Sequence, residues 1–151
     1  MQEVFKKLEH QLKRGNDYLL LCSELDLIFK PTPDKWSKKE ILGHLIDSAI
    51  NNLQRFTEIQ YADKPYQIRP YNQNELVLAN DYHNADLQEL LRFWLAINHR
   101  IIAIINRQSA KSLNYQIEIY EKEIKDLRFL MTDYVDHLEH HLNQIVVKID
   151  S

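Results

Sequence analysis

Three histidines lie within five residues near the C-terminus, in the stretch DYVDHLEHHLNQI. His137 and His141 are four residues apart, so on a helix both imidazoles can reach a common point about 2 Å from each ring nitrogen, as a metal ion requires. The other interpretation of such a pair is a partly buried set of rings hydrogen-bonded to carboxylates or to the backbone. The spacing alone leaves both interpretations open.

Helical periodicity separates these three histidines. At about 100° per residue, His141 lies within the apolar stripe of its helix and His137 lies at the edge, about 40° away. His140 lies about 100° from His141, on the polar side with Asp133 and Asp136. The pattern therefore favours His137 and His141 over His140 as inward-facing groups.

A fourth histidine, His44, follows Gly43 in ILGHLIDS, and the missing glycine side chain leaves room beside it. The apolar stripe of this helix includes Leu45, and His44 lies about 100° from that residue. Periodicity by itself therefore does not place His44 in the core. His10, which lies among lysines and glutamates, is predicted to be solvated.

The composition is that of a folded globular protein, with 44% hydrophobic and 27% charged residues among 151. The net charge of −3 and the mixing of basic with acidic residues argue against nucleic acid as a partner, because phosphate binding needs clustered cations. Cys22 is the only cysteine, so no intrachain disulfide is possible, and its apolar surroundings predict an inert buried thiol. No window approaches the roughly 18 to 20 apolar residues of a membrane span. The stretch MQEVFKKLEHQLKRG has no continuous apolar core, so we do not expect it to be a signal peptide. We expect a soluble, cytoplasmic protein with one domain, residues 1–151.

Apolar residues at three-to-four spacing predict four long helices. A capping box, Ser37 with Glu40, marks the start of the second, and Asp86 with Glu89 marks the third. Gly15 is a possible weak point in the first. The expected helices run from Glu3 to Phe29, from Ser37 to at least Phe56, from near Asp86 to at least Ile105, and from about Glu123 to Lys148.

Two connections differ in character. The segment from Ala62 to Ala85 is rich in Tyr, Asn, Asp and Pro, and a connection of this length is often functional. The stretch NYQIEIYE alternates in part and predicts a short extended segment. Together these features predict an all-α fold, a four-helix bundle with a long connection between its second and third helices.

The second and last helices carry a family resemblance. WSKKEILGHLIDSAINNLQRF, from Trp36 to Phe56, and DLRFLMTDYVDHLEHHLNQI, from Asp126 to Ile145, resemble the helix signatures of the DinB superfamily. The resemblance implies a four-helix bundle, often a homodimer, in which three histidines hold a divalent metal. Carried over by motif, the ligands are His44, His137 and His141. Imidazole ligands suit Zn²⁺, Ni²⁺ or Fe²⁺, and the sequence does not choose among them.

The resemblance also implies a class of chemistry. Three imidazoles leave coordination positions open, which is typical of catalytic rather than structural metal sites. Family members include thiol-dependent transferases, isomerases and hydrolases. We therefore expect a metal-dependent transferase or hydrolase acting on a small molecule, with a low-molecular-weight thiol as one candidate substrate. The stretch SLNYQIEIYEKEIK departs from the His-Pro or Gly-containing loop of many relatives, so the substrate class stays open.

No acid or base can be assigned from the sequence, so the catalytic residues are unknown. Asp47, Asp133 and Asp136 could orient a ligand histidine, although a solvated acid is the simpler interpretation of each. Tyr134 fits the core better than a proton donor. Arg55 could meet an anionic substrate, with a salt bridge as the simpler account. The alternative function is a non-catalytic, dimeric helical bundle that acts as a small-ligand-binding or interaction module.

Overall fold

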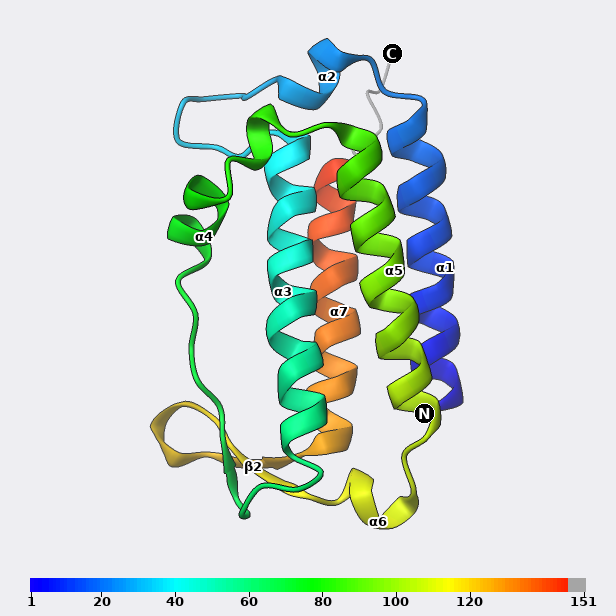
Figure 1. The fold of residues 1–151 in the computed structure, drawn as a ribbon, viewed down its shortest axis with the longest axis vertical. Helices are drawn as coiled ribbons and strands as arrows, with labels where there is room; N and C mark the ends of the chain where they lie inside the picture. Colours follow the sequence, from blue (N-terminus) through cyan, green and yellow to red (C-terminus); the bar gives the residue numbers. More distant parts are fainter. Residues whose placement is uncertain (147–151) are drawn as a thin grey trace.

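The computed structural model describes residues 1–146, and four long helices dominate it (Figure 1). Helix α1 packs against both α5 and α7, and α3 packs against the same two helices, so α1 and α3 lie on a diagonal of the bundle. The predicted four-helix bundle is confirmed. The four helices are α1 (Gln2–Leu20), α3 (Lys38–Glu58), α5 (Leu87–Asn106) and α7 (Leu127–Ile145).

Chain direction explains the long connection. In Figure 1, α1 and α7 run from the lower end of the bundle to the upper end, whereas α3 and α5 both run downward. Because α3 and α5 are parallel neighbours, the chain must return along the whole bundle between them. This connection carries β1 (Tyr66–Gln67), α4 (Gln73–Ala79) and the 3₁₀ turn η1 (Tyr82–Asn84).

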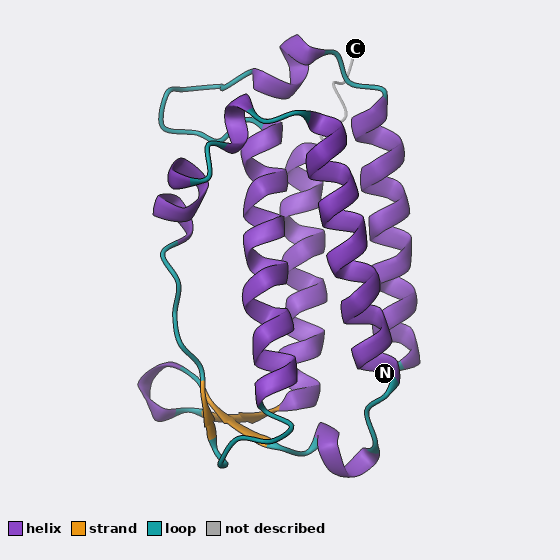
Figure 2. Cartoon of the chain, in the orientation of Figure 1, coloured by secondary structure: helices purple, strands orange, loops and turns teal. Residues whose placement is uncertain are grey.

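A small sheet closes the lower end of the bundle (Figure 2). Strand β1 pairs in parallel with β2 (Gln116–Glu118), and β2 pairs antiparallel with β3 (Ile124–Asp126). Ile117 is the common partner, opposite Tyr66 on one side and Lys125 on the other. The extended segment predicted within NYQIEIYE is thus confirmed for its central residues. Short helical turns flank these strands, α6 (Ala110–Leu113) and η2 (Tyr120–Lys122).

The predicted first helix was too long. The chain leaves α1 at Leu20, and a separate helix, α2 (Glu24–Ile28), begins where the Ser23 side chain accepts a hydrogen bond from the Asp26 N–H. Gly15 is not a weak point, because α1 continues through it. A Cβ there would lie 2.7 Å from the Trp94 ring, so the glycine allows α1 to approach α5 closely.

The predicted start of the last helix was also wrong. Residues from Ile124 to Asp126 belong to β3, and α7 begins only at Leu127, where the Asp126 carboxylate accepts from the Phe129 N–H. The predicted end at Lys148 lies outside the described residues. The starts of α3 and α5 are confirmed, since Ser37 forms both bonds of its capping box and Asp86 caps Glu89.

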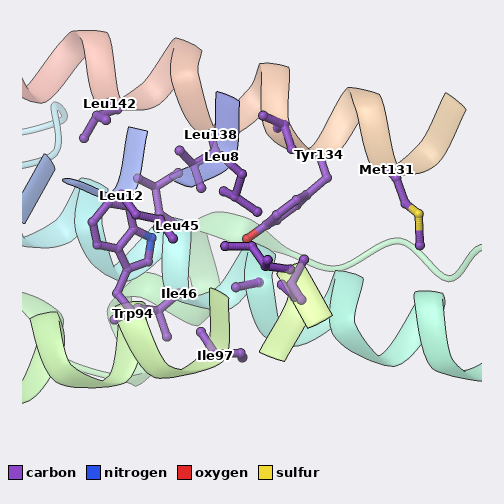
Figure 3. Close-up of a cluster of buried hydrophobic side chains, with 14 of the residues drawn as sticks. Leu8, Leu12, Leu45, Ile46, Trp94, Ile97, Met131, Tyr134, Leu138 and Leu142 are labelled. Atoms are coloured by element: carbon purple, nitrogen blue, oxygen red, sulfur yellow. The ribbon is translucent and has the colours of Figure 1, made fainter. Parts of the chain in front are cut away.

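Side chains from all four long helices form the core (Figure 3). Trp94 of α5 is fully buried and lies among leucines of α1, α3 and α7. Tyr134, predicted for the core, is buried, and its hydroxyl donates to the Asn98 side chain of α5. Within residues 1–146, no helix has both the length and the hydropathy needed to cross a membrane.

Candidate metal centre

The structure brings His44, His137 and His141 together between α3 and α7. One ring nitrogen from each residue falls within 4.8 Å of the other two. The Nε2 atoms of His44 and His137 are 3.3 Å apart, and the His141 ring centroid lies 4.5 Å from each of the other centroids. The two α7 histidines occupy successive turns of one helix face, and the neighbouring α3 supplies the third.

His44 is completely buried, contrary to the interpretation from periodicity. That interpretation assumed a single covered face, but every residue of α3 from Ile41 to Ala49 is buried. The second face is covered by chain outside the four long helices. The Trp36 ring lies 4.9 Å from the His44 ring, and the Tyr82 ring rests on Gly43.

Burial keeps the cluster neutral. Desolvation, together with the charges of the neighbouring rings, lowers the pKa of His44 to about 3 and that of His137 to about 4. The pKa of His141 is also lowered by desolvation, and its hydrogen bond to Gln144 works in the opposite direction. Near pH 7 all three imidazoles are therefore uncharged, which is the form that binds a metal ion.

The hydrogen bonds of the three rings do not fit a purely structural role. Among the described residues, neither His44 nor His137 bonds to a carboxylate or to the backbone, and the buried Nδ1 of His44 has no partner. A buried polar group left without a hydrogen bond costs about 1–3 kcal/mol. His141 differs, because its Nδ1 lies 3.0 Å from Gln144 Oε1. That bond leaves the Nε2 of His141 free.

The donor set fits a small divalent ion. Metal–imidazole distances of about 2.0–2.1 Å and a tetrahedral angle give a nitrogen–nitrogen separation of about 3.3–3.4 Å. The observed separation between His44 and His137 is 3.3 Å. His140, which periodicity placed outside the site, is exposed and lies beyond His141, with a ring-centroid distance of 5.1 Å.

The acidic residues near the cluster behave differently from one another. Asp47 is buried, so its interpretation as a solvated acid was wrong. Its carboxylate accepts hydrogen bonds from the Tyr82 hydroxyl, at 2.6 Å, and from the Asn80 side chain. Burial raises its pKa. Asp133 and Asp136 are exposed, as the simpler interpretation predicted, and Asp136 pairs with a lysine of α1.

Two cavities open beside the histidines. One, of about 610 Å³, is lined by His137 and runs between α3 and α7 toward the sheet. The other, of about 400 Å³, is lined by His141, Trp36 and Gln144. A small molecule can therefore approach the cluster from either side.

Comparison with known proteins identifies the family. The model of the DinB superfamily matches residues 7–145, which is most of the chain. The chain belongs to the DinB superfamily. This match spans the helix that carries His44 and the helix that carries His137 and His141.

Individual proteins resemble the chain in sequence, in fold or in both. YfiT of Bacillus subtilis (strain 168), provisionally named a metal-dependent hydrolase, is 28% identical over 95% of this chain and 79% of its own. The solved YfiT structure superposes with a TM-score of 0.86 at 22% identity, covering 95% of this chain and 82% of that one. A mycothiol-dependent maleylpyruvate isomerase shares the fold with a TM-score of 0.76 at 10% identity, covering 97% of this chain and 61% of that one.

Sequence reasoning missed three residues that shape this histidine cluster. Trp36 and Gln144 both lie in the DinB-like motifs, yet periodicity gave no reason to place them against His44 and His141. Tyr82 lies in the long connection, where no pattern pointed to contact with α3. The one available signal was Gly43, because a helical glycine is often kept where a neighbour approaches closely.

Replacing Gly43 by alanine should destabilise the protein although alanine favours helix. The new Cβ would lie 2.1 Å from the Tyr82 ring, so the ring and its bond to Asp47 must shift. We expect overpacking to cost about 1–3 kcal/mol, more than the helix gain of up to about 1 kcal/mol. In a Tyr82→Ala background the same change should be neutral or stabilising. Urea denaturation of the wild type, the two single variants and the double variant measures this coupling. If Gly43→Ala changed the free energy of unfolding equally in the wild-type and the Tyr82→Ala backgrounds, the contact would be contradicted.

Proposed function

We propose that this chain is a metal-dependent enzyme acting on a small molecule, with His44, His137 and His141 holding one divalent ion. The observation that carries the proposal is the convergence of three neutral imidazoles, one buried and two half-buried, that make no carboxylate or backbone bond within residues 1–146. The ion would be Zn²⁺, Ni²⁺ or Fe²⁺, all of which accept imidazole. When bound, such an ion supplies Lewis acidity that lowers the pKa of a water or a thiol beside it.

The surrounding residues have separate tasks in this proposal. Gln144 accepts the Nδ1–H of His141 and so directs Nε2 toward the other two rings. Trp36 covers the His44 ring and keeps water from that side. Asp133 lines the larger cavity one turn before His137, and desolvation and the charge of Asp136 raise its pKa. It is the carboxylate best placed to take a proton from a substrate in that cavity.

Two reactions suit this arrangement, hydrolysis and transfer to or from a low-molecular-weight thiol. Hydrolysis is supported by the name of the YfiT relative, and thiol chemistry by the mycothiol dependence of the isomerase that shares the fold. Both need the same neutral histidines and the same access from the two cavities. We further propose that the protein acts as a homodimer in the cytoplasm.

Native mass spectrometry tests the metal and the dimer in one experiment. We expect about one divalent ion per chain, and an assembly of twice the 18.1 kDa chain mass. Hydrolysis of chromogenic esters and amides, and transfer of simple thiols to a chromogenic electrophile, should then exceed the rates of the metal-free protein. Folded protein that takes up no ion from Zn²⁺ or Ni²⁺ solutions overturns the proposal. Metal uptake without either reaction would favour the non-catalytic ligand-binding module.

A further inference from the structure

A row of polar side chains from α3 lines the larger cavity and leads away from the histidines. Ser48, Asn52 and Arg55 line it, and they follow His44 on one face of α3 at intervals of three and four residues. Ser48 and Asn52 are both buried. A continuous row of polar groups therefore connects the histidine cluster with a guanidinium at the far end.

The Arg55 guanidinium is held in place by the chain after β1. One of its terminal nitrogens donates to the Arg69 carbonyl at 2.7 Å, and Cζ lies 5.5 Å from the centre of the Tyr71 ring. The Ile68 N–H bonds to Glu118 of the sheet, which fixes this segment. Since guanidinium has five N–H donors, most of them stay available to a ligand.

Arg55 is positioned but not neutralised. Within residues 1–146, no carboxylate lies within ion-pairing distance of it, so the salt bridge considered from the sequence is absent there. Glu58, one turn further along α3, instead accepts from Gln54 and Tyr66. Among the described residues that line the cavity, Arg55 is the only lysine or arginine. A half-buried, unpaired guanidinium facing a cavity favours an anionic ligand.

The middle of this polar row, between the histidines and Arg55, offers hydrogen bonds rather than charge. Asn52 Nδ2 donates to the Ser48 carbonyl at 2.9 Å and contacts Ser48 Oγ at 3.4 Å. The side-chain oxygen of Asn52 and the hydroxyl hydrogen of Ser48 remain for a ligand. A polar linker, able both to donate and to accept, is complementary to these two groups.

The single carboxylate among the described lining residues does not block an anion at Arg55. Asp133 lies one turn from His137 on α7, whereas Arg55 is eleven residues, or about 16 Å of helix axis, from His44. Because α3 and α7 are antiparallel and His44 faces His137, Asp133 lies much closer to the histidine level than Arg55 does. The negative and positive groups thus occupy different levels of the cavity.

We propose that this cavity binds an elongated small molecule whose carboxylate contacts Arg55 while its reactive end lies at the histidines. The inference rests on the proposed function, and it adds the charge and the shape of the substrate. The two oxygens of a carboxylate match the planar fork of guanidinium in a bidentate pair. The carboxylate could belong to the thiol or to the second substrate, because both need one end at the histidine cluster.

The test uses Co²⁺-loaded protein and ω-mercaptoalkanoic acids of three to ten methylenes, each beside the mercaptoalcohol of equal length. Sulfur-to-cobalt absorbance reports binding of the thiol. We expect the acid to bind about 10- to 100-fold more tightly than the alcohol at one matched length, as for a charge-assisted hydrogen bond. Arg55→Gln should abolish this preference. Arg69→Gln removes a neighbouring charge outside the cavity and should retain it.

A parallel series of ω-carboxyalkyl hydroxamic acids, compared with neutral alkyl hydroxamic acids, mimics an acyl substrate. A preference confined to the thiols assigns the carboxylate to the thiol, and one confined to the hydroxamates assigns it to the acyl substrate. No carboxylate preference in either series, or the same preference in Arg55→Gln, overturns the inference. If cobalt does not bind, the proposed function fails separately. The role of Arg55 is then decided with metal-free protein, to which adipate or 1,6-hexanediol is added. The NMR signal of the Arg55 Nε–H should shift with adipate and not with the diol.

Discussion

His137→Ala should reduce the bound divalent metal from about one ion per chain to nearly none, with the helical content unchanged. The Nε2 of His137 lies 3.3 Å from that of His44, so the substitution removes one of three donors that surround one point. Loss of an outer hydrogen-bond partner already weakens metal sites by about 10- to 100-fold. Loss of a direct ligand should therefore weaken affinity by more than about 100-fold, as measured by elemental analysis after dialysis.

The matched control is His140→Ala, which changes an exposed histidine of the same helix next to His141. It should keep the full metal content, whereas His44→Ala on the facing helix should lose the ion as His137→Ala does. Circular dichroism checks that each variant is folded. Equal losses in His140→Ala and His137→Ala would show that the metal binds nonspecifically to the histidine-rich surface. An unchanged metal content in His44→Ala would remove α3 from the site.

The metal-free protein should lose several kcal/mol of unfolding free energy between pH 7 and pH 5. Burial lowers the pKa of His44 to about 3 and that of His137 to about 4. In the unfolded chain both titrate near pH 6.5, so below that pH the unfolded state binds more protons and acid favours unfolding. Each group contributes about 1.4 kcal/mol per pH unit, or about 2–4 kcal/mol for the pair at pH 5. Urea denaturation at several pH values in the presence of a chelator measures this slope.

His44→Gln isolates the contribution of one ring to that pH dependence. The free energy of unfolding of the variant should depend on pH less steeply than that of wild type, by the equivalent of about one proton. Relative to wild type, the variant should therefore be more stable at pH 5 than at pH 7. Asp47 and Asp133, whose raised pKa values act in the opposite direction, are common to both proteins and cancel in the comparison. Identical slopes in wild type and His44→Gln would contradict a buried neutral histidine at this position.

The fold was predictable where a single helix carries its own signals. The Ser37 and Asp86 caps and the three-to-four spacing of apolar residues located the starts of α3 and α5. The same signals failed at the ends of the first and last helices. There Ser23 starts a separate helix, and Ile124 to Asp126 pair with β2. Sheet pairing and a change of direction depend on distant residues, which local spacing does not contain.

The sequence by itself determined the bundle, the family and the inward direction of His137 and His141, because one helix fixes how its own turns are aligned. Only the tertiary structure decided that His44 is buried. Trp36, Tyr82 and the connection around α4 cover a second face of α3 that periodicity treats as exposed. The structure also decided that Asp47 bonds Tyr82 and that Arg55 faces a cavity with no ion-pair partner among the described residues. Each of these features depends on which segments meet across the bundle, and distances between segments are set by packing rather than by spacing along the chain.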